Sequence, residues 1–378
     1  MSPRVPTFTI GIEEEYLLID PVSRDVVADP PQEIFTECAA PNREGVVEPE
    51  LLRSQIEVET RVSETVGEAR THLVELRRLA STVAARHGLA IMAASTHPFA
   101  EWHVQRTTDK QRYHTLYRDM QALARRLFIC GMHVHVGIAD DELRVQLLNQ
   151  FRPFLPLLLA LSTSSPFWEG ENSGLKSYRT TVFDNFPRSG LPESFADYAD
   201  YQRHIDILTR SGVMDDATFI WWDMRISARY PTLECRVMDI CTRLQDAIAI
   251  AALIQSLLHW LCRMQRDNAA RQLYSRFLVD QNRWRAIRYG LDAGLVDFTT
   301  ERIVPVADLL EDAVATVYPD AEILGCAAEL EQILEIPRRG TSAHRQLETY
   351  VDAIGKGKST TEALHAVVDM LVQETLPE

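Results

Sequence analysis

The chain has 378 residues, of which 46% are hydrophobic and 25% are charged, and its formal net charge at pH 7 is -15. This composition is typical of a soluble globular protein, and the length suits one large or two ordinary domains. Because a negative field repels nucleic-acid backbones and anionic membranes, we expect neither as a partner, and an anionic substrate would need local cations at its site.

Signals for export, membrane insertion and disulfide chemistry do not stand out in the sequence. The first ten residues lack the apolar core of a signal peptide, and apolar runs such as 154–161 are too short to cross a bilayer. The six cysteines include no CxxC pair, which argues against a zinc ribbon or a disulfide framework. We therefore expect a cytoplasmic protein.

The first element in chain order is a predicted strand over residues 7–19 with three consecutive glutamates. Alternation places Glu13 and Glu15 on one face, and Glu14 on the other face among apolar residues. Two carboxylates about 7 Å apart on one strand face repel each other unless a cation lies near them. The segment indicates either a divalent-metal site on an open sheet or an ordinary solvated strand face.

The following elements alternate between short strands and helices. Further strands are predicted over residues 55–62, 89–95, 131–138, 219–227 and 232–239. Apolar residues at three- and four-residue spacing predict helices over 65–87, 109–127, 141–163, 194–210 and 244–289. After about residue 300 the pattern is mainly helical, with a break at 337–340 and a capping box at Ser359 and Glu362. We expect a catalytic body over residues 1–300 and a helical extension over 301–378 packed on it.

Four later strands repeat the pattern of the first, with one apolar face and one face of ionisable residues. The paired polar residues are Glu57 and Glu59, His133 and His135, Asp223 and Arg225, and Glu234 and Arg236, and Glu50 lies seven residues before Glu57. Carboxylates and a single imidazole suit magnesium or manganese, whereas guanidinium forks suit phosphate and carboxylate oxygens. Together they predict a sheet curved around a metal–nucleotide site.

Other common motifs for phosphate or zinc are absent from the sequence. There is no GxxxxGK[ST], no GxGxxG after a strand and no HEXXH helix. For His97, a hydrogen-bonded loop histidine and a substrate-binding histidine are equally open readings.

At these residues the sequence resembles the bacterial carboxylate–amine ligases of the type-2 glutamate–cysteine ligase family, in the glutamine synthetase-like superfamily. The matching segments are GIEEE (11–15), ELLRSQIEVET (50–60), STHPF (95–99), GMHVHVG (131–137), LSTSSPF (161–167) and WWDMRISARYPTLECRVMD (221–239). Ser95 departs from the glycine that relatives often have there. The resemblance implies an α+β fold, with a curved antiparallel half-barrel sheet that helices cover on its convex face.

The resemblance also implies site residues on the concave face, with ATP and Mg²⁺ or Mn²⁺ as the expected cofactors. The implied metal ligands are Glu13, Glu15, Glu50, Glu57, His133 and Glu234. Arg225 and Arg236 look like the arginines that bind phosphate and stabilise the transition state. The implied substrate-binding residues are Tyr178, Arg179, Thr96, His97 and His135.

The reaction implied is ATP-dependent amide formation through an acyl phosphate, with weak glutamate–cysteine ligase activity. The partners are then small molecules: ATP, a carboxylate such as glutamate, and an amine chosen by the loops 96–115 and 165–190. The general base stays open between acids such as Glu59 and Asp223. The alternatives are a phosphagen-kinase-like phosphotransferase, a metal-dependent hydrolase that uses the HVH strand, and a non-catalytic ATP or metabolite sensor. We expect a homo-oligomer.

Overall fold

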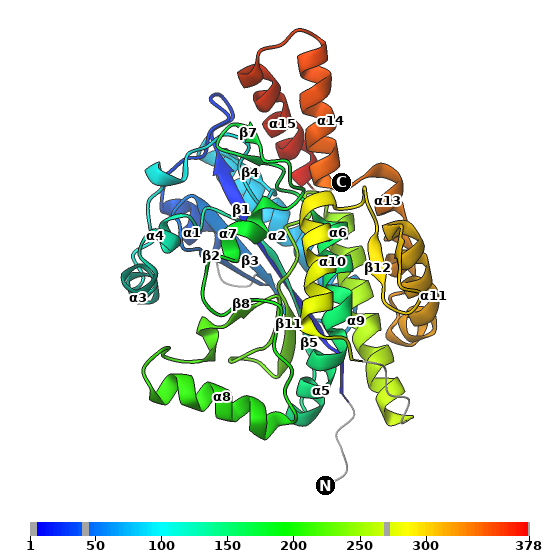
Figure 1. Cartoon of the computed structure of the whole chain (residues 1–378). Coiled ribbons are helices and arrows are strands. Elements are labelled where there is room, and N and C mark those ends of the chain that lie inside the picture. The colour runs from blue at the N-terminus through cyan, green and yellow to red at the C-terminus, as the bar shows by residue number, and fades with distance from the viewer. Residues whose placement is uncertain (1–5, 40–44, 268–272, 377–378) are drawn as a thin grey trace.

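A seven-stranded antiparallel sheet organises the fold of this computed structural model, which describes residues 6–39, 45–267 and 273–376 (Figure 1). The strand order is β10 (Met224–Ile226), β11 (Thr232–Cys235), β5 (Met132–Gly137), β1 (Ile10–Ile19), β3 (Gln55–Thr60) and β2 (Gly45–Pro49). Strand β4 (Ala90–Met92) pairs with the far end of β1. The predicted α+β class is confirmed. Strand β2 was not predicted, because its two valines are too few to show an alternation.

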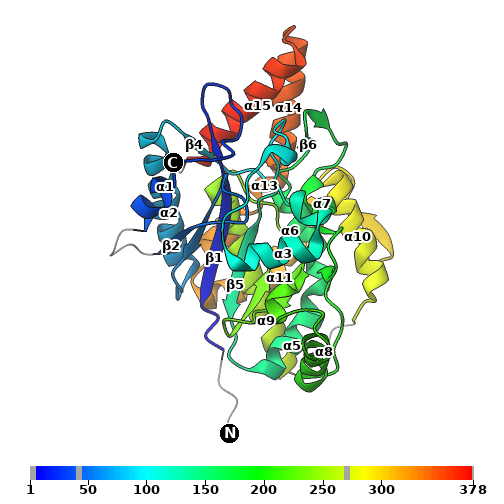
Figure 2. The same ribbon diagram turned by 90° about the vertical axis from the view of Figure 1, so that its left-hand side faces the viewer.

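Helices cover one face of the sheet. Helices α2 (Val66–Arg86), α5 (Asp141–Phe151) and α9 (Leu244–Arg266) pack on it, and the apolar side chains of β1 and β5 are buried beneath them. Figure 2 shows α3 (Gln111–Met120) and α7 (Tyr178–Phe183) on the viewer's side of the sheet, with α9 behind it. The sheet therefore has one covered face and one face that α3 and α7 only partly overlie.

The long predicted helices are divided where the backbone changes direction. The segment 109–127 forms α3 and α4 (Ala122–Arg125), because Gln121 between them has φ +50°. The segment 141–163 forms α5, a 3₁₀ turn (Arg152–Phe154) and α6 (Leu155–Ser162), and Pro153 and Pro156 lie at the starts of the last two elements. The segment 194–210 contains α8 (Tyr198–Arg210), and 244–289 contains α9 and α10 (Arg276–Tyr289).

The remaining elements are short or lie at the C-terminal end. They are α1 (Glu33–Cys38), the hairpin of β6 (Phe167–Trp168) and β7 (Glu171–Asn172), the pairs β8 (Ser189–Gly190) with β9 (Trp221–Trp222) and β12 (Leu295–Asp297) with β13 (Arg302–Val304), 3₁₀ turns at Trp102–Val104 and Ala217–Phe219, and α11 (Val306–Leu324), α12 (Ala327–Gln332), α13 (Glu335–Arg339), α14 (Ser342–Gly355) and α15 (Thr360–Thr375). The predicted capping box at Ser359 and Glu362 opens α15.

Helix α9 is long and apolar enough to cross a bilayer, which the shorter apolar runs noted in the sequence did not suggest. Of its most apolar 18-residue window, 83% is buried inside the protein. Because its neighbours are the sheet, α2, α5, α6, α11 and α12, it is the central core helix of this fold.

Beneath β1, the glutamate on the covered face is neutralised by a buried arginine. Glu14 is fully buried, and its two oxygens accept from Arg77 Nη2 at 2.6 Å and Nε at 2.8 Å. The same guanidinium donates to the carbonyl oxygens of Cys241, Thr242 and Thr375. A single side chain of α2 thus connects β1, the segment after β11 and the end of α15.

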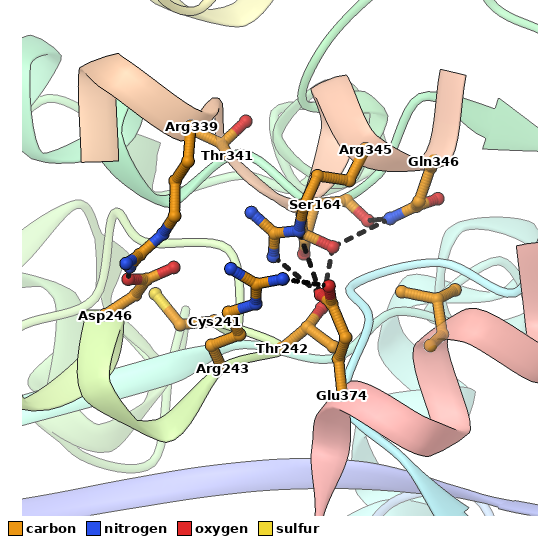
Figure 3. Close-up of polar contacts among 12 residues, drawn as sticks. Ser164, Cys241, Thr242, Arg243, Asp246, Arg339, Thr341, Arg345, Gln346 and Glu374 are labelled. Carbon is orange, nitrogen blue, oxygen red and sulfur yellow. Dashed lines mark hydrogen bonds and ion pairs between the residues drawn. The ribbon is translucent and has the colours of Figure 1, made fainter. Parts of the chain in front are cut away.

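Ion pairs join the C-terminal helices to the start of α9 (Figure 3). Glu374 of α15 accepts from Arg243 at 2.5 Å and from Arg345 Nε at 2.9 Å, and Arg339 pairs with Asp246. These carboxylates and guanidiniums are largely matched to one another.

The division of the chain into two parts at residue 300 stays a prediction.

Candidate active site

A cavity of about 460 Å³ lies on the open face of the sheet. Antiparallel pairing brings its residues together, because side chains directly opposite each other share a face. Glu13 lies opposite both His133 and Glu59, and Glu15 lies opposite Glu57. The ionisable residues of the lining are Glu13, Glu15, Glu48, Glu50, Glu57, Glu59, Glu234, His133, His135, Lys110, Arg112, Arg179, Arg225, Arg229 and Arg236.

Glu13 is held between two imidazoles. Its Oε2 lies 2.9 Å from His133 Nδ1, and its Oε1 lies 3.0 Å from His135 Nε2. Burial alone would raise the pKa of Glu13, but the hydrogen bonds and charges of the two histidines hold it well below the usual range. Burial and the charge of Arg236 lower the pKa of His133 to about 4. A neutral His133 that donates from Nδ1 keeps Nε2 as a lone pair, the form that binds metals.

Glu15, Glu50 and Glu57 are buried carboxyl groups, and burial is the largest cause that raises the pKa of each of them. Burial and the neighbouring Glu50 raise the pKa of Glu15 to about 8. Burial, followed by Glu50, Glu13 and Glu15, raises the pKa of Glu57 well above its usual range. Carboxylates placed this close become stable as anions when a cation joins them.

The donor atoms of these residues fit a divalent cation. One ligand atom each from Glu15, Glu57 and His133 lie within 4.8 Å of one another, and the same holds for Glu13, His133 and Glu234. Carboxylate oxygens with a single imidazole are the ligands expected of Mg²⁺ or Mn²⁺.

Arginines form the other half of the cavity, and two of them share one acid. Arg225 donates to Glu234 from Nε at 2.7 Å and from Nη2 at 3.0 Å, and Arg236 also donates to Glu234. Burial would raise the pKa of Glu234, but Arg236 and Arg225 lower it far more. Glu234 is therefore an anchor for both guanidiniums as well as a possible ligand.

Arg179 and Arg236 each keep an unused donor. Both Nε atoms are buried and have no hydrogen-bond partner among the described residues. Gly131 makes room for Arg179, since a Cβ at position 131 would collide with the Arg179 guanidinium. An anion in the cavity would satisfy these donors.

Comparison with known proteins identifies the family of this chain. The profile described as glutamate-cysteine ligase family 2 matches residues 9–370. The chain belongs to this family. A relative from Rhodospirillum rubrum with the provisional name glutamate–cysteine ligase 2 is 53% identical over 99% of this chain and 97% of its own. One of the same name from Ruegeria pomeroyi is 47% identical over 97% of this chain and 94% of its own.

Solved structures share the fold of this glutamate–cysteine ligase family member at low sequence identity. A bifunctional glutathione synthetase from Pasteurella multocida has a TM-score of 0.69 at 14% identity, over 97% of this chain and 52% of that one. A glutamate–cysteine ligase from Francisella tularensis in complex with AMP has a TM-score of 0.67 at 13% identity, over 98% of this chain and 89% of that one. The family makes this protein an ATP-dependent ligase of the glutamate–cysteine ligase kind.

The structure brings most of the predicted site residues of this family member into the cavity. All six predicted metal ligands line it, together with Arg179, His135 and the two predicted catalytic arginines. Tyr178 instead lines a smaller neighbouring cavity. Of the two acids considered as general base, Glu59 lines the cavity, whereas Asp223 is buried against Arg283 with an oxygen 2.6 Å from its Nε.

The structure does not bring Thr96 and His97 to the cavity. Thr96 is buried and donates to the carbonyl of Phe167 at 2.8 Å. His97 Nδ1 accepts from the amides of Phe99 and Ala100, and its Nε2 lies 2.9 Å from the carbonyl of Arg24. Burial lowers the pKa of His97 to about 3, so the ring is neutral and donates from Nε2. This geometry is that of a hydrogen-bonded loop histidine.

Several lining residues were missed by the sequence analysis. Lys110, Arg112 and Tyr113 reach the cavity from the start of α3, and Arg229 and Tyr230 reach it from the turn before β11. An amphipathic helix and a short turn carry no spacing that points to a site. The available signals were that Arg229 and Tyr230 lie within the matching segment 221–239, and that residues 110–113 lie within the loop 96–115.

Proposed function

We propose that this protein is a carboxylate–amine ligase that forms an amide through an acyl phosphate and releases ADP and phosphate. Glutamate is the proposed carboxylate, and cysteine is an amine that the enzyme uses weakly. The relatives named as glutamate–cysteine ligases support this choice of substrates.

One observation carries the proposal: a cluster of buried acids with raised pKa values and a pair of anchored arginines share a single cavity. A triphosphate and a carboxylate repel each other, so their reaction needs positive charge on both sides of the transferred group. A divalent cation held by Glu15, Glu57 and His133 would neutralise phosphate oxygens and act as a Lewis acid.

The arginines would act on the opposite side of the phosphoryl group. Arg225 binds phosphate oxygens, while Arg236, whose Nε has no partner among the described residues, stabilises the charge that develops during transfer. Arg179 binds the carboxylate substrate. The substrate carboxylate attacks the γ-phosphorus of ATP, and ADP leaves.

Deprotonation of the amine requires a base, and we propose Glu59. It lines the cavity, and burial together with Glu13 and Glu48 raises its pKa. A carboxylate with a raised pKa takes a proton from an ammonium group more readily. The free amine then attacks the acyl carbon and expels phosphate.

The test measures ADP, phosphate and amide in the same reaction with ATP, glutamate and an amine. We expect equal amounts of the three products. Phosphorylated substrate without amide would favour the phosphotransferase, and turnover without any nucleotide would favour the hydrolase.

Arg236→Lys provides the matching variant. Lysine keeps the charge but loses the planar fork, so ATP affinity should stay within about tenfold while turnover falls by about 10³-fold. Undiminished turnover would remove Arg236 from the chemistry. Arg53→Lys, on an exposed ion pair with Asp29, is the control and should leave turnover unchanged.

A further inference from the structure

Asp239 is a fully buried acid between β11 and α9, and it does not line the cavity. Its Oδ2 accepts from the Ser164 amide at 2.8 Å and from the Ser165 hydroxyl at 2.7 Å, and its Oδ1 accepts from the Ser177 hydroxyl at 2.8 Å. The three donors lie at the two ends of the segment 164–177, which carries the β6–β7 hairpin and leads into α7. Asp239 therefore holds the two ends of this segment together.

The first turn of α7 depends on the same hydrogen bonds. Ser177 is the residue before α7, but its hydroxyl makes no cap to the helix because it donates to Asp239. Instead, the Tyr178 amide donates to the Ser165 carbonyl at 2.9 Å, and the Arg179 amide donates to the Ser165 hydroxyl at 3.1 Å. That hydroxyl also donates to Asp239, so one chain of hydrogen bonds runs from Asp239 through Ser165 to the backbone of Arg179.

The position of the Arg179 guanidinium depends on the same part of the chain. Gly131, whose missing Cβ makes room for the guanidinium, pairs with Asp239 in an isolated antiparallel bridge. Burial lowers the pKa of Arg179, and the charge of Asp239 opposes this shift more than the charge of Glu15 does. Both side chains lie in the described part of the chain and form no direct ion pair, so the Arg179 Nε stays free for a ligand while Asp239 supplies a counter-charge.

We propose that Asp239 is a positioning residue for the carboxylate substrate, because through Ser165 it fixes the start of α7 with Arg179 directed into the cavity. The inference rests on the proposed function, in which Arg179 binds the substrate carboxylate. Without these hydrogen bonds the start of α7 moves, Arg179 is displaced from the acid, and the acid binds more weakly. Binding of ATP, which we assign to the metal and to Arg225 and Arg236, does not depend on α7.

The first experiment separates the hydrogen bonds of Asp239 from its charge. Asp239→Asn keeps all three bonds, since its amide oxygen accepts from Ser164 and Ser165 and its amide nitrogen donates to Ser177. Asp239→Ala loses them. In isothermal titration of the full chain with Mg²⁺ and ADP present, glutamate should bind about tenfold or more weakly to Asp239→Ala than to the wild type, and no more weakly to Asp239→Asn. Equal weakening in both variants, or no glutamate binding to the wild type, would overturn the inference.

Steady-state kinetics distinguish positioning from a purely structural role. A purely structural acid would change the fraction of folded enzyme, and therefore the apparent kcat, without changing either KM. We expect Asp239→Ala to raise the KM for glutamate about tenfold and to leave the KM for ATP unchanged. Asp320→Ala is the control and should change neither, because Asp320 is also fully buried but lies between α11 and α9, where it accepts from Arg263 Nη2 at 2.7 Å. A lower kcat with both KM values unchanged in Asp239→Ala would reject the positioning role.

Two adjacent buried serines provide a milder test that does not depend on the folding of Asp239→Ala. Ser165→Ala removes the hydroxyl that joins Asp239 to the Arg179 amide. Ser164→Ala keeps the backbone amide that donates to the acid, and it loses the bond that its hydroxyl accepts from the Ser95 amide at 3.1 Å. Both substitutions remove the same group at a fully buried position. Glutamate binding should weaken about threefold or more in Ser165→Ala and should not change in Ser164→Ala. Equal effects would contradict the inference.

Hydrogen exchange of the substrate-free protein separates this inference from the proposed function. In Asp239→Ala, the Tyr178 and Arg179 amides should exchange faster than in the wild type. Ser165→Ala should have the same effect, and Ser164→Ala should have none. Faster exchange and weaker glutamate binding without any amide product would reject the ligase function and leave Asp239 assigned. Amide formation with unchanged exchange and an unchanged KM for glutamate in Asp239→Ala would leave the ligase and reject the positioning role.

Discussion

Both faces of β1 carry a glutamate, and the two glutamates have opposite electrostatic surroundings. Glu14, on the covered face, is fully buried and bonded through both oxygens to Arg77. Glu15, one residue later, faces the cavity, where burial and Glu50 raise its pKa to about 8. A buried acid with a dedicated guanidinium supports the fold, whereas buried acids placed close together form a site that suits a divalent cation.

The largest expected effect comes from breaking the ion pair of Glu14 with Arg77 on the covered face. Arg77→Met leaves Glu14 buried without a counter-charge, so the free energy of unfolding should fall by about 3–5 kcal/mol. Urea-induced unfolding measures it. The double variant Glu14→Leu with Arg77→Met removes both charges and should recover part of the loss. A stable single variant would mean that the pair contributes little.

The stability of the protein should also depend on a divalent metal bound to the acids of the open face. If Mg²⁺ binds the acid cluster, 100 times its dissociation constant should stabilise the folded protein by about 2.7 kcal/mol. Glu57→Gln should abolish this gain and make the metal-free protein no less stable, since it removes one repelling carboxylate. Glu75→Gln, on the exposed side of α2, is the control. A gain that persists in Glu57→Gln would place the metal elsewhere.

The pH dependence of the unfolding free energy of the metal-free protein tests the same difference between Glu14 and Glu15. The pKa of Glu15 is about 8 in the folded protein, against about 4.3 when unfolded, so the folded state binds more protons between these values. Stability should therefore decrease as the pH rises from about 5 to 8. Mg²⁺ should flatten this slope, because it lowers the pKa of its ligands. Thermal unfolding at several pH values, with EDTA or with Mg²⁺, measures both effects.

The smallest expected effect concerns the Tyr16 hydroxyl, which also contacts Glu14 on the covered face. Tyr16 donates to Glu14, so Tyr16→Phe removes one hydrogen bond and leaves the Arg77 contacts in place. The loss in unfolding free energy should be about 1–2 kcal/mol. Ligase turnover should not change, because the hydroxyl lies on the covered face. A loss of turnover with retained stability would contradict this separation of the faces.

Alternation along single strands made much of the site predictable. It separated Glu13 and Glu15 from Glu14, and it paired His133 with His135 and Glu234 with Arg236, as the structure has them. Partners from distant segments were not predictable. Neither the ion pair of Arg77 with Glu14 nor that of Arg283 with Asp223 has a local pattern, because each depends on how a helix lies against the sheet.

The same limit explains the loops. STHPF matched the family as a motif, but a motif does not tell whether a histidine faces a cavity or its own backbone, and His97 does the latter. Strand β2 and the cavity residues at the start of α3 were not predicted for a related reason. Each involves only a few residues, and packing rather than a local sequence pattern sets their positions.

The close approach of Gly131 and Arg179 has a consequence for altering substrate range. The guanidinium occupies the space that any side chain at position 131 would need. Gly131→Ala would therefore move Arg179 by one methyl group's width without altering its charge. Since we propose that Arg179 binds the substrate carboxylate, position 131 is a place where a directed-evolution library could change the accepted carboxylic acid while every ionisable group stays intact.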